Sequence, residues 1–178
     1  MGTLPAQLRE VREQYGRHLR AWAVSVLLFP ACLYFCSHRG FYTLLDDADL
    51  IIHEAGHVFF AILGHDFHIM GGTLMQIVLP LVLAGSFYRH SYRTGVQVSL
   101  FWLGHNLINI SVYAADARAQ RLPLLGGDHV LHDWHTMLGG VGLLDSATAV
   151  GNSFFVLAVI AFGMAVLMPA LMWEGVAE

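Results

Sequence analysis

Five apolar stretches, separated by short polar segments, dominate the hydrophobic pattern of this chain. They cover about residues 21–36, 44–63, 73–88, 95–115 and 151–173. An α-helix needs roughly 20 predominantly apolar residues to cross the hydrocarbon core of a bilayer, and each stretch comes close to that length. The pattern therefore predicts an all-α protein, a polytopic membrane helix bundle of about five spans, of which the third is the shortest.

Two amphipathic segments lie outside the predicted spans. In residues 1–20, apolar side chains recur at helical spacing among four Arg residues, which indicates a helix on the membrane surface. The one long connection, 116–150, gathers apolar side chains on one face around Trp134, which indicates an interfacial helix before the last span. We expect a single membrane domain over 1–178, with four spans in 21–115 and the last in 151–173.

The composition supports a membrane environment. The chain is 56% hydrophobic and only 12% charged, with a mean hydropathy of +0.58, whereas a soluble domain carries about a quarter of charged residues. So few charged residues cannot cover a water-facing surface. We therefore expect lipid to cover much of the surface of this protein. The net charge of −4 and the pI near 6.2 give no reason to expect nucleic acid as a partner.

The placement of positive charge predicts the orientation in the membrane. All nine basic residues are Arg. A cytoplasmic N-terminus places six of them inside (Arg9, Arg12, Arg17, Arg20, Arg118 and Arg121) and three outside (Arg39, Arg89 and Arg93). Cytoplasmic loops carry an excess of Lys and Arg. We therefore expect an integral membrane protein with a cytoplasmic N-terminus and a cytoplasmic connection at 116–150.

A short motif in the second predicted span carries the candidate chemistry. Residues 53–57 read His-Glu-Ala-Gly-His. On a helix, His53 and His57 share a face and can hold one metal ion, while Glu54 can reach a water molecule on that ion. This is the HExxH arrangement of zinc peptidases. Because ionisable groups at membrane depth are costly unless paired or hydrated, we expect a metal centre, with zinc or another divalent metal as cofactor.

The third metal ligand stays open at this point. After Glu54 the next Glu is Glu174, so an Asp or His must complete the centre. We favour Asp116, which ends the fourth predicted span on the membrane side where His57 lies. Asp133, with His132 beside it in the segment His-Asp-Trp-His, is the alternative ligand or a residue that supports the ligands.

Further polar residues of the predicted spans are expected to surround the centre. Asp49 precedes His53 by one turn and can accept the second ring proton of that imidazole, which would fix its tautomer. Four more polar residues of the third and fourth spans are candidates to line the site or to stabilise an oxyanion: Gln76, His105, Asn106 and Asn109.

The segment from about 44 to 120 combines the motif HEAGH in a membrane helix with Gly71-Gly72 and with Pro80 in the next span. In these features it resembles the site-2 protease family of intramembrane zinc peptidases. The resemblance implies hydrolysis of a peptide bond in or near the bilayer, and a third zinc ligand that is an Asp on a later span. That Asp is usually followed by Gly in the family, whereas Ala117 follows Asp116 here. The chain also resembles small uncharacterised bacterial membrane proteins of this type, which implies a bacterial cytoplasmic membrane.

Two hypotheses of other classes compete with a peptidase. The chain could be a non-catalytic accessory subunit of a larger membrane complex, with a structural or vestigial metal site; a closed four-ligand site would favour this. A haem held by His57 and His105 would leave Glu54 without a role. The expected partners are membrane lipid and either a membrane-protein substrate or the other subunits of a complex.

Overall fold

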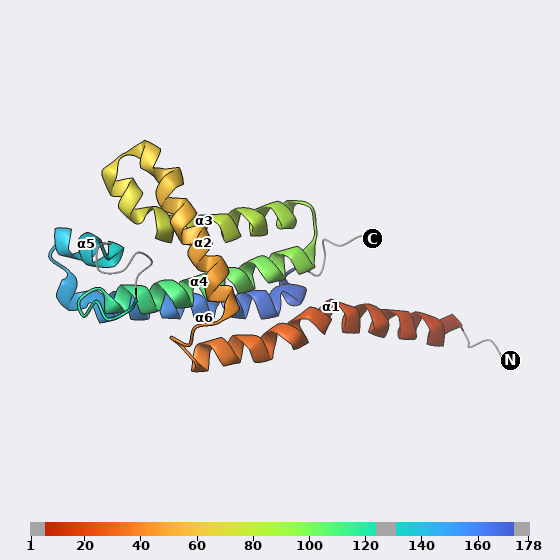
Figure 1. Cartoon of the computed structure of the whole chain (residues 1–178). Helices are drawn as coiled ribbons and strands as arrows, with labels where there is room; N and C mark the ends of the chain where they lie inside the picture. The colour runs from red at the N-terminus through yellow and green to blue at the C-terminus, as the bar shows by residue number, and fades with distance from the viewer. Residues whose placement is uncertain (1–5, 124–130, 173–178) are drawn as a thin grey trace.

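The structure, a computed structural model, describes residues 6–123 and 131–172. In these ranges it contains helices and no strand, which confirms the predicted all-α fold (Figure 1). The helices are α1 (Ala6–Ser37), α2 (Leu44–Phe60), α3 (His65–Arg89), α4 (Arg93–Asp116), α5 (Asp133–Gly140) and α6 (Ala147–Leu171), with 3-10 turns η1 (Ala61–Leu63) and η3 (Leu144–Ser146).

The central helix is α4, which packs along α6 and also contacts α1, α2, α3 and α5 (Figure 1). Small residues allow α4 and α6 to approach closely. A Cβ added at Gly104 would lie 2.5 Å from the ring of Phe162, and one added at Gly151 would lie 2.5 Å from the carbonyl oxygen of Ser111. Because other helices surround α4, the polar residues of its middle turns lie inside the protein.

The pair formed by α2 and α3 is also held at short range by glycine. The chain reverses at Gly64, whose φ of +113° is rarely adopted by residues that have a side chain. Further along, a Cβ added at Gly56 would lie 2.2 Å from the carbonyl oxygen of Gly71. The backbones of α2 and α3 therefore touch beside the HEAGH segment.

The helix boundaries depart from the predicted segments in three places. The third predicted span, 73–88, was expected to be the shortest, but α3 begins eight residues earlier, at His65, and is 25 residues long. Residues 6–20 of the predicted interfacial helix and the first span predicted at 21–36 belong to one continuous helix, α1, while residues 1–5 lie outside the described ranges. No proline or glycine separates the two segments, so nothing ends the helix between them. The second predicted span, 44–63, is divided into α2, which ends at Phe60, and η1.

Two helical segments of the described chain are long and apolar enough to cross a membrane, His65–Arg89 and Leu144–Leu171. The apolar part of α1, Ala21–Ser37, is shorter. Both α2 and α4 contain buried charged or polar residues, which lower their hydropathy. The remaining three predicted spans, and the orientation, stay predictions.

The interfacial helix predicted within 116–150 corresponds to α5, while residues 124–130 lie outside the described ranges. Trp134 does not lie at a surface as predicted. Its side chain is buried, and its ring packs edge-on against Phe154 of α6 at a centroid distance of 5.3 Å. Burying this large ring against α6 fixes α5 over one end of the bundle, and this brings the first residue of α5, Asp133, to the HEAGH motif.

Candidate metal centre

The two histidines of the motif meet a carboxylate from a distant part of the chain. Asp133 Oδ2 lies 3.0 Å from His53 Nε2 and 3.3 Å from His57 Nε2. Two ligand atoms, each about 2.0–2.1 Å from a tetrahedral zinc ion, are themselves about 3.3 Å apart. The spacing therefore fits the His-His-Asp donor set of a zinc centre. We call these three residues the first centre.

The other ring nitrogen of each histidine is already bonded. His57 Nδ1 donates to the carbonyl oxygen of His68 at 2.7 Å, and His53 Nδ1 lies 3.0 Å from Gln76 Oε1. Because these oxygens only accept, Nδ1 carries the proton in both rings, and the lone pair lies on Nε2. Two lone pairs facing a carboxylate oxygen would repel it, so this arrangement favours a positive charge between them: either a proton on Nε2, which then hydrogen-bonds Asp133, or a metal ion. A metal ion satisfies all three at once.

Asp133 is held in place by α4. Its backbone N–H donates to Tyr113 Oη at 3.1 Å, and the Tyr113 hydroxyl donates to Asp133 Oδ2 at 3.4 Å. Burial raises the pKa of Asp133, but hydrogen bonds from His53 and His57 outweigh it and bring the pKa down to about 2. The carboxylate is therefore ionised at neutral pH, as a metal ligand must be.

The Gly-Gly pair noted in the sequence has a direct role at the first centre. A Cβ added at Gly72 would lie 2.4 Å from Cε1 and Nε2 of His53. The imidazole lies against the bare backbone of α3, and only glycine leaves room for it there. With the Gln76 bond, this contact fixes the position of the ring.

The first centre opens onto a cavity of about 1020 Å³. Glu54 lines this cavity beside His53 and His57, and its side chain is exposed. Most of the remaining lining is apolar and comes from α1, α2, α3, α4 and the segment before α5; it includes Phe35, Phe41, Leu50, Val58, Ile69, Ile108, Val112 and Leu131. A carboxylate beside a candidate metal, in a largely apolar cavity, is the setting in which a general base acts.

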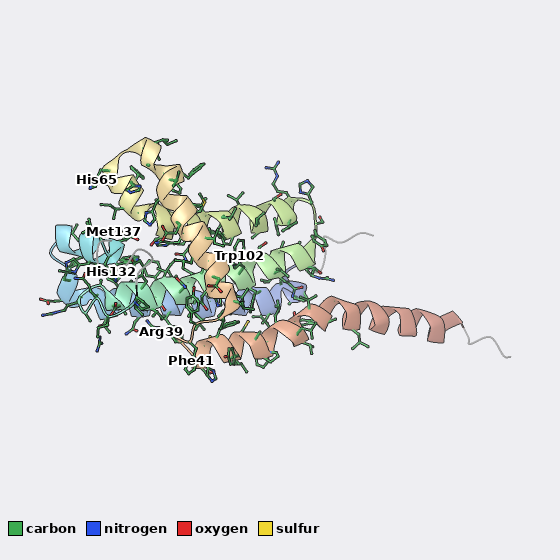
Figure 2. The ribbon with its side chains drawn as sticks, viewed as in Figure 1. Arg39, Phe41, His65, Trp102, His132 and Met137 are labelled. Atoms are coloured by element: carbon green, nitrogen blue, oxygen red, sulfur yellow. The ribbon has the colours of Figure 1, made fainter. Side chains whose placement is uncertain are left out.

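A second group of ligand-type residues lies beside the same cavity, which Asp46 and His105 line. Asp46 and Asp49 of α2 face His105 of α4, and one ligand atom of each lies within 4.8 Å of the others. Figure 2 shows Trp102 of α4 close to α2, where its indole N–H donates to Asp49 Oδ1 at 2.8 Å. We call Asp46, Asp49 and His105 the second centre.

Asp116, the favoured third ligand, does not join His53 and His57. Its Oδ2 accepts hydrogen bonds from the backbone N–H groups of Arg121 and Leu122, at 2.8 and 2.9 Å, where the chain leaves α4. The carboxylate stabilises a turn at the helix end, and Asp133, the alternative, takes the place next to the histidines. His132 lies beside Asp116, with Nε2 3.8 Å from its Oδ2, and is not part of the first centre.

The other expected neighbours are also placed differently. Gln76, and not Asp49, bonds the second ring nitrogen of His53. Asn109 donates to Asp46 Oδ1 at 3.1 Å and accepts from Gln76 Nε2 at 3.3 Å, while Asn106 donates to the carbonyl oxygen of Trp102 at 3.0 Å. These amides hold other groups in place, although Asn109 and His105 do line the cavity.

Tyr113 was not among the predicted site residues. Its signal in the sequence is its place on α4, one turn beyond Asn109 and on the stripe that also contains His105. Nothing in the pattern indicates that its hydroxyl meets the first residue of α5.

Comparisons with protein-family models, with curated proteins and with solved structures find no match to this chain.

Proposed function

We propose that this protein is a membrane-embedded zinc metallopeptidase that hydrolyses a peptide bond in or near the bilayer. The observation that carries the proposal is the convergence of His53 and His57 on Asp133 within 3.3 Å, with Glu54 on the same cavity wall. An HExxH helix, a carboxylate ligand and a general base together are the parts of a zinc peptidase.

Each residue of the site has a separate role in the proposed hydrolysis. His53, His57 and Asp133 would hold the zinc ion, which would supply Lewis acidity that polarises the scissile carbonyl and makes water more acidic. Glu54 would accept a proton from the water whose oxygen adds to that carbonyl carbon, and would deliver it to the amine nitrogen as the carbon–nitrogen bond breaks. Gln76 and Tyr113 keep the ligands oriented through His53 and Asp133. The apolar cavity walls favour a substrate segment with apolar side chains.

Exposed apolar side chains support the membrane location. Large apolar patches on a protein surface mark contact with lipid or with another protein. On α6 the exposed set is Val156, Leu157, Val159, Ile160, Met164, Leu167 and Leu171, and on α1 it includes Val26, Leu27, Phe29 and Leu33. We propose that these faces meet lipid, in a bundle of about five spans with a cytoplasmic N-terminus in a bacterial membrane.

The test uses the full chain, purified in detergent and reconstituted into liposomes with a library of quenched fluorescent apolar peptides. Wild type should contain bound zinc and cleave some of these peptides. The variant Glu54→Gln should keep its zinc and cleave about 100- to 10,000-fold more slowly, the usual contribution of a general base. Asp47→Asn, which changes an exposed carboxylate of α2, should leave cleavage unchanged.

Two results would overturn the peptidase. Purified wild type without stoichiometric metal would remove the zinc centre. Bound zinc without any cleavage, or cleavage that Glu54→Gln does not slow, would favour the accessory subunit with a structural metal site.

A further inference from the structure

We propose that the second centre, formed by Asp46, Asp49 and His105, binds a divalent transition-metal ion of its own. The group is separate from the HEAGH histidines but faces the same cavity. The inference concerns metal binding alone and does not depend on peptidase activity.

Both carboxylate oxygens of Asp46 are held by hydrogen-bond donors. Its Oδ2 accepts from the backbone N–H and the hydroxyl of Thr43, at 2.7 and 2.8 Å, and its Oδ1 accepts from Asn109 Nδ2 at 3.1 Å. Every one of these partners is a donor, so both oxygens of the carboxylate act as acceptors. Asp46 is also buried, at 8% exposure.

Asp49 carries a second negative charge a few ångströms away. It is completely buried, and both its oxygens accept hydrogen bonds, one from Trp102 and one from His105 Nδ1 at 2.7 Å. This Asp–His pair is the arrangement that orients metal-binding imidazoles: the carboxylate holds the proton on Nδ1 and increases the basicity of Nε2.

The atom that points to a ligand is His105 Nε2. His105 is only 2% exposed, and within the described residues this nitrogen makes no hydrogen bond. The acidic oxygen beside it, Asp46 Oδ2, lies 4.0 Å away, which is too far for a hydrogen bond. The 4.0 Å separation is wider than the roughly 3.3 Å between tetrahedral zinc ligands, but one ion can still contact both atoms. A nitrogen of a buried ring, oriented by Asp49 and without a hydrogen-bond partner in the described residues, therefore faces a carboxylate across a gap that a metal ion can bridge.

The surroundings provide no other counter-charge. In the described part of the chain the ion pairs of Asp46 and Asp49 involve His105 alone, and the sequence contains no Lys. Two buried carboxylates near each other are costly unless a cation compensates them. Because Asp49 bonds the Nδ1 side of the ring, the ion would be held by His105 Nε2 and Asp46, with Asp49 as the residue that positions the imidazole. An imidazole with a carboxylate suits zinc or manganese better than calcium, which takes six to eight oxygen ligands.

The position of the second centre suggests what the ion does. Its ligands come from α2 and α4, so an ion would join the two helices. From Asp46, hydrogen bonds continue through Asn109 and Gln76 to His53 Nδ1. An ion at the second centre would thus stiffen the hydrogen-bonded chain that orients a ligand of the first.

The experiment counts metal ions in the full chain purified in detergent, equilibrated with zinc or with manganese and then desalted. Wild type should hold two ions per chain by elemental analysis. His105→Gln and Asp49→Asn should each hold one, His53→Ala should hold one, and the double variant His53→Ala with His105→Gln should hold none. Asp47→Asn, on the same turn of α2 but exposed, is the matched control and should hold two.

Wild type that saturates below two ions, with either metal, would overturn the second centre, as would two ions retained in both His105→Gln and Asp49→Asn. If one ion remains and only His53→Ala removes it, the second centre is wrong and the first stands. If one ion remains and only His105→Gln removes it, the assignment of the first centre as a metal site is wrong and the second centre stands. The wild-type count decides the question even if a variant fails to fold, and circular dichroism identifies such a variant.

Discussion

The two centres share one helix and one cavity, yet their histidines are oriented by different kinds of partner. In the first centre, the Nδ1 atoms bond neutral oxygens, those of Gln76 and of the His68 backbone. In the second, His105 Nδ1 bonds a buried carboxylate, Asp49. A carboxylate partner makes the metal-binding nitrogen more basic, whereas a neutral partner leaves the metal a stronger Lewis acid. The first centre therefore suits activation of water, and the second suits tight, static binding.

The groups next to the two centres also differ in whether they can exchange protons. Glu54, exposed to the cavity, lies next to the first centre and can exchange protons with a substrate. At the second centre the neighbouring groups, Trp102 and Asn109, only donate hydrogen bonds to the two carboxylates. The comparison teaches that two sets of His and Asp side chains with similar spacing can differ in the groups bonded to them, and therefore in the use to which a metal ion could be put.

The largest expected effect comes from replacing Asp133, the carboxylate ligand of the first centre. Asp133→Asn should eliminate the ion of the first centre, a loss beyond the roughly 10- to 100-fold weakening expected for partners outside the ligand set. Asp116→Asn should retain both ions, because the Asp116 carboxylate bonds the backbone N–H groups of Arg121 and Leu122. Chelator competition followed by metal analysis measures both. Loss of an ion in Asp116→Asn but not in Asp133→Asn would reverse the assignment.

The motif residues, together with Asp133 and Asp116, show what the sequence could and could not predict about the site. His53, Glu54 and His57 are fixed relative to one another by helical spacing, so the pattern alone identified them. Asp133 lies 80 residues from His53, and it reaches the centre because α5 packs through Trp134 and bonds Tyr113. No periodicity encodes that docking. The position of Asp116 at a helix end was predicted correctly, but the competing backbone donors of the following turn were not.

The fold shows the same division between local and distant information. Apolar stretches predicted where helices occur, because burial and helix formation both follow local composition. They did not predict that α1 is continuous through Arg20, because an amphipathic segment and an apolar segment can belong to one helix. The close contact of Gly56 with Gly71 was also invisible, since each glycine by itself indicates only flexibility.

A second, smaller effect tests whether the first centre depends on the bare backbone of α3. In Gly72→Ala the new Cβ would lie 2.4 Å from the His53 ring, so the ring or the helix must move. Overpacking of this kind costs about 1–3 kcal/mol, and it should weaken metal binding at the first centre and leave the second centre loaded. Thermal unfolding in detergent and the metal count are the measurements.

Gly85→Ala is the control on the same helix, because a Cβ there would meet no atom within 4 Å. Alanine is the better helix former by about 1 kcal/mol, so this variant should be as stable as wild type or slightly more so. Equal destabilisation by both substitutions would mean that α3 is not packed against His53 as described.

The smallest effect separates the two centres through the residue that lies between them. Gln76→Leu removes the acceptor of His53 Nδ1–H, and also the donor to Asn109, while keeping a similar side-chain size. We expect about 10- to 100-fold weaker zinc binding at the first centre and little change at the second, as measured by chelator titration of each. Gln97→Leu is the matched control, because Gln97 is buried on α4 but bonds Ser25 and the Ala165 carbonyl oxygen. If Gln76→Leu weakened both centres equally, Gln76 would not be a partner of the first centre in particular, and the different chemistry of the two centres could no longer be assigned to their separate partners.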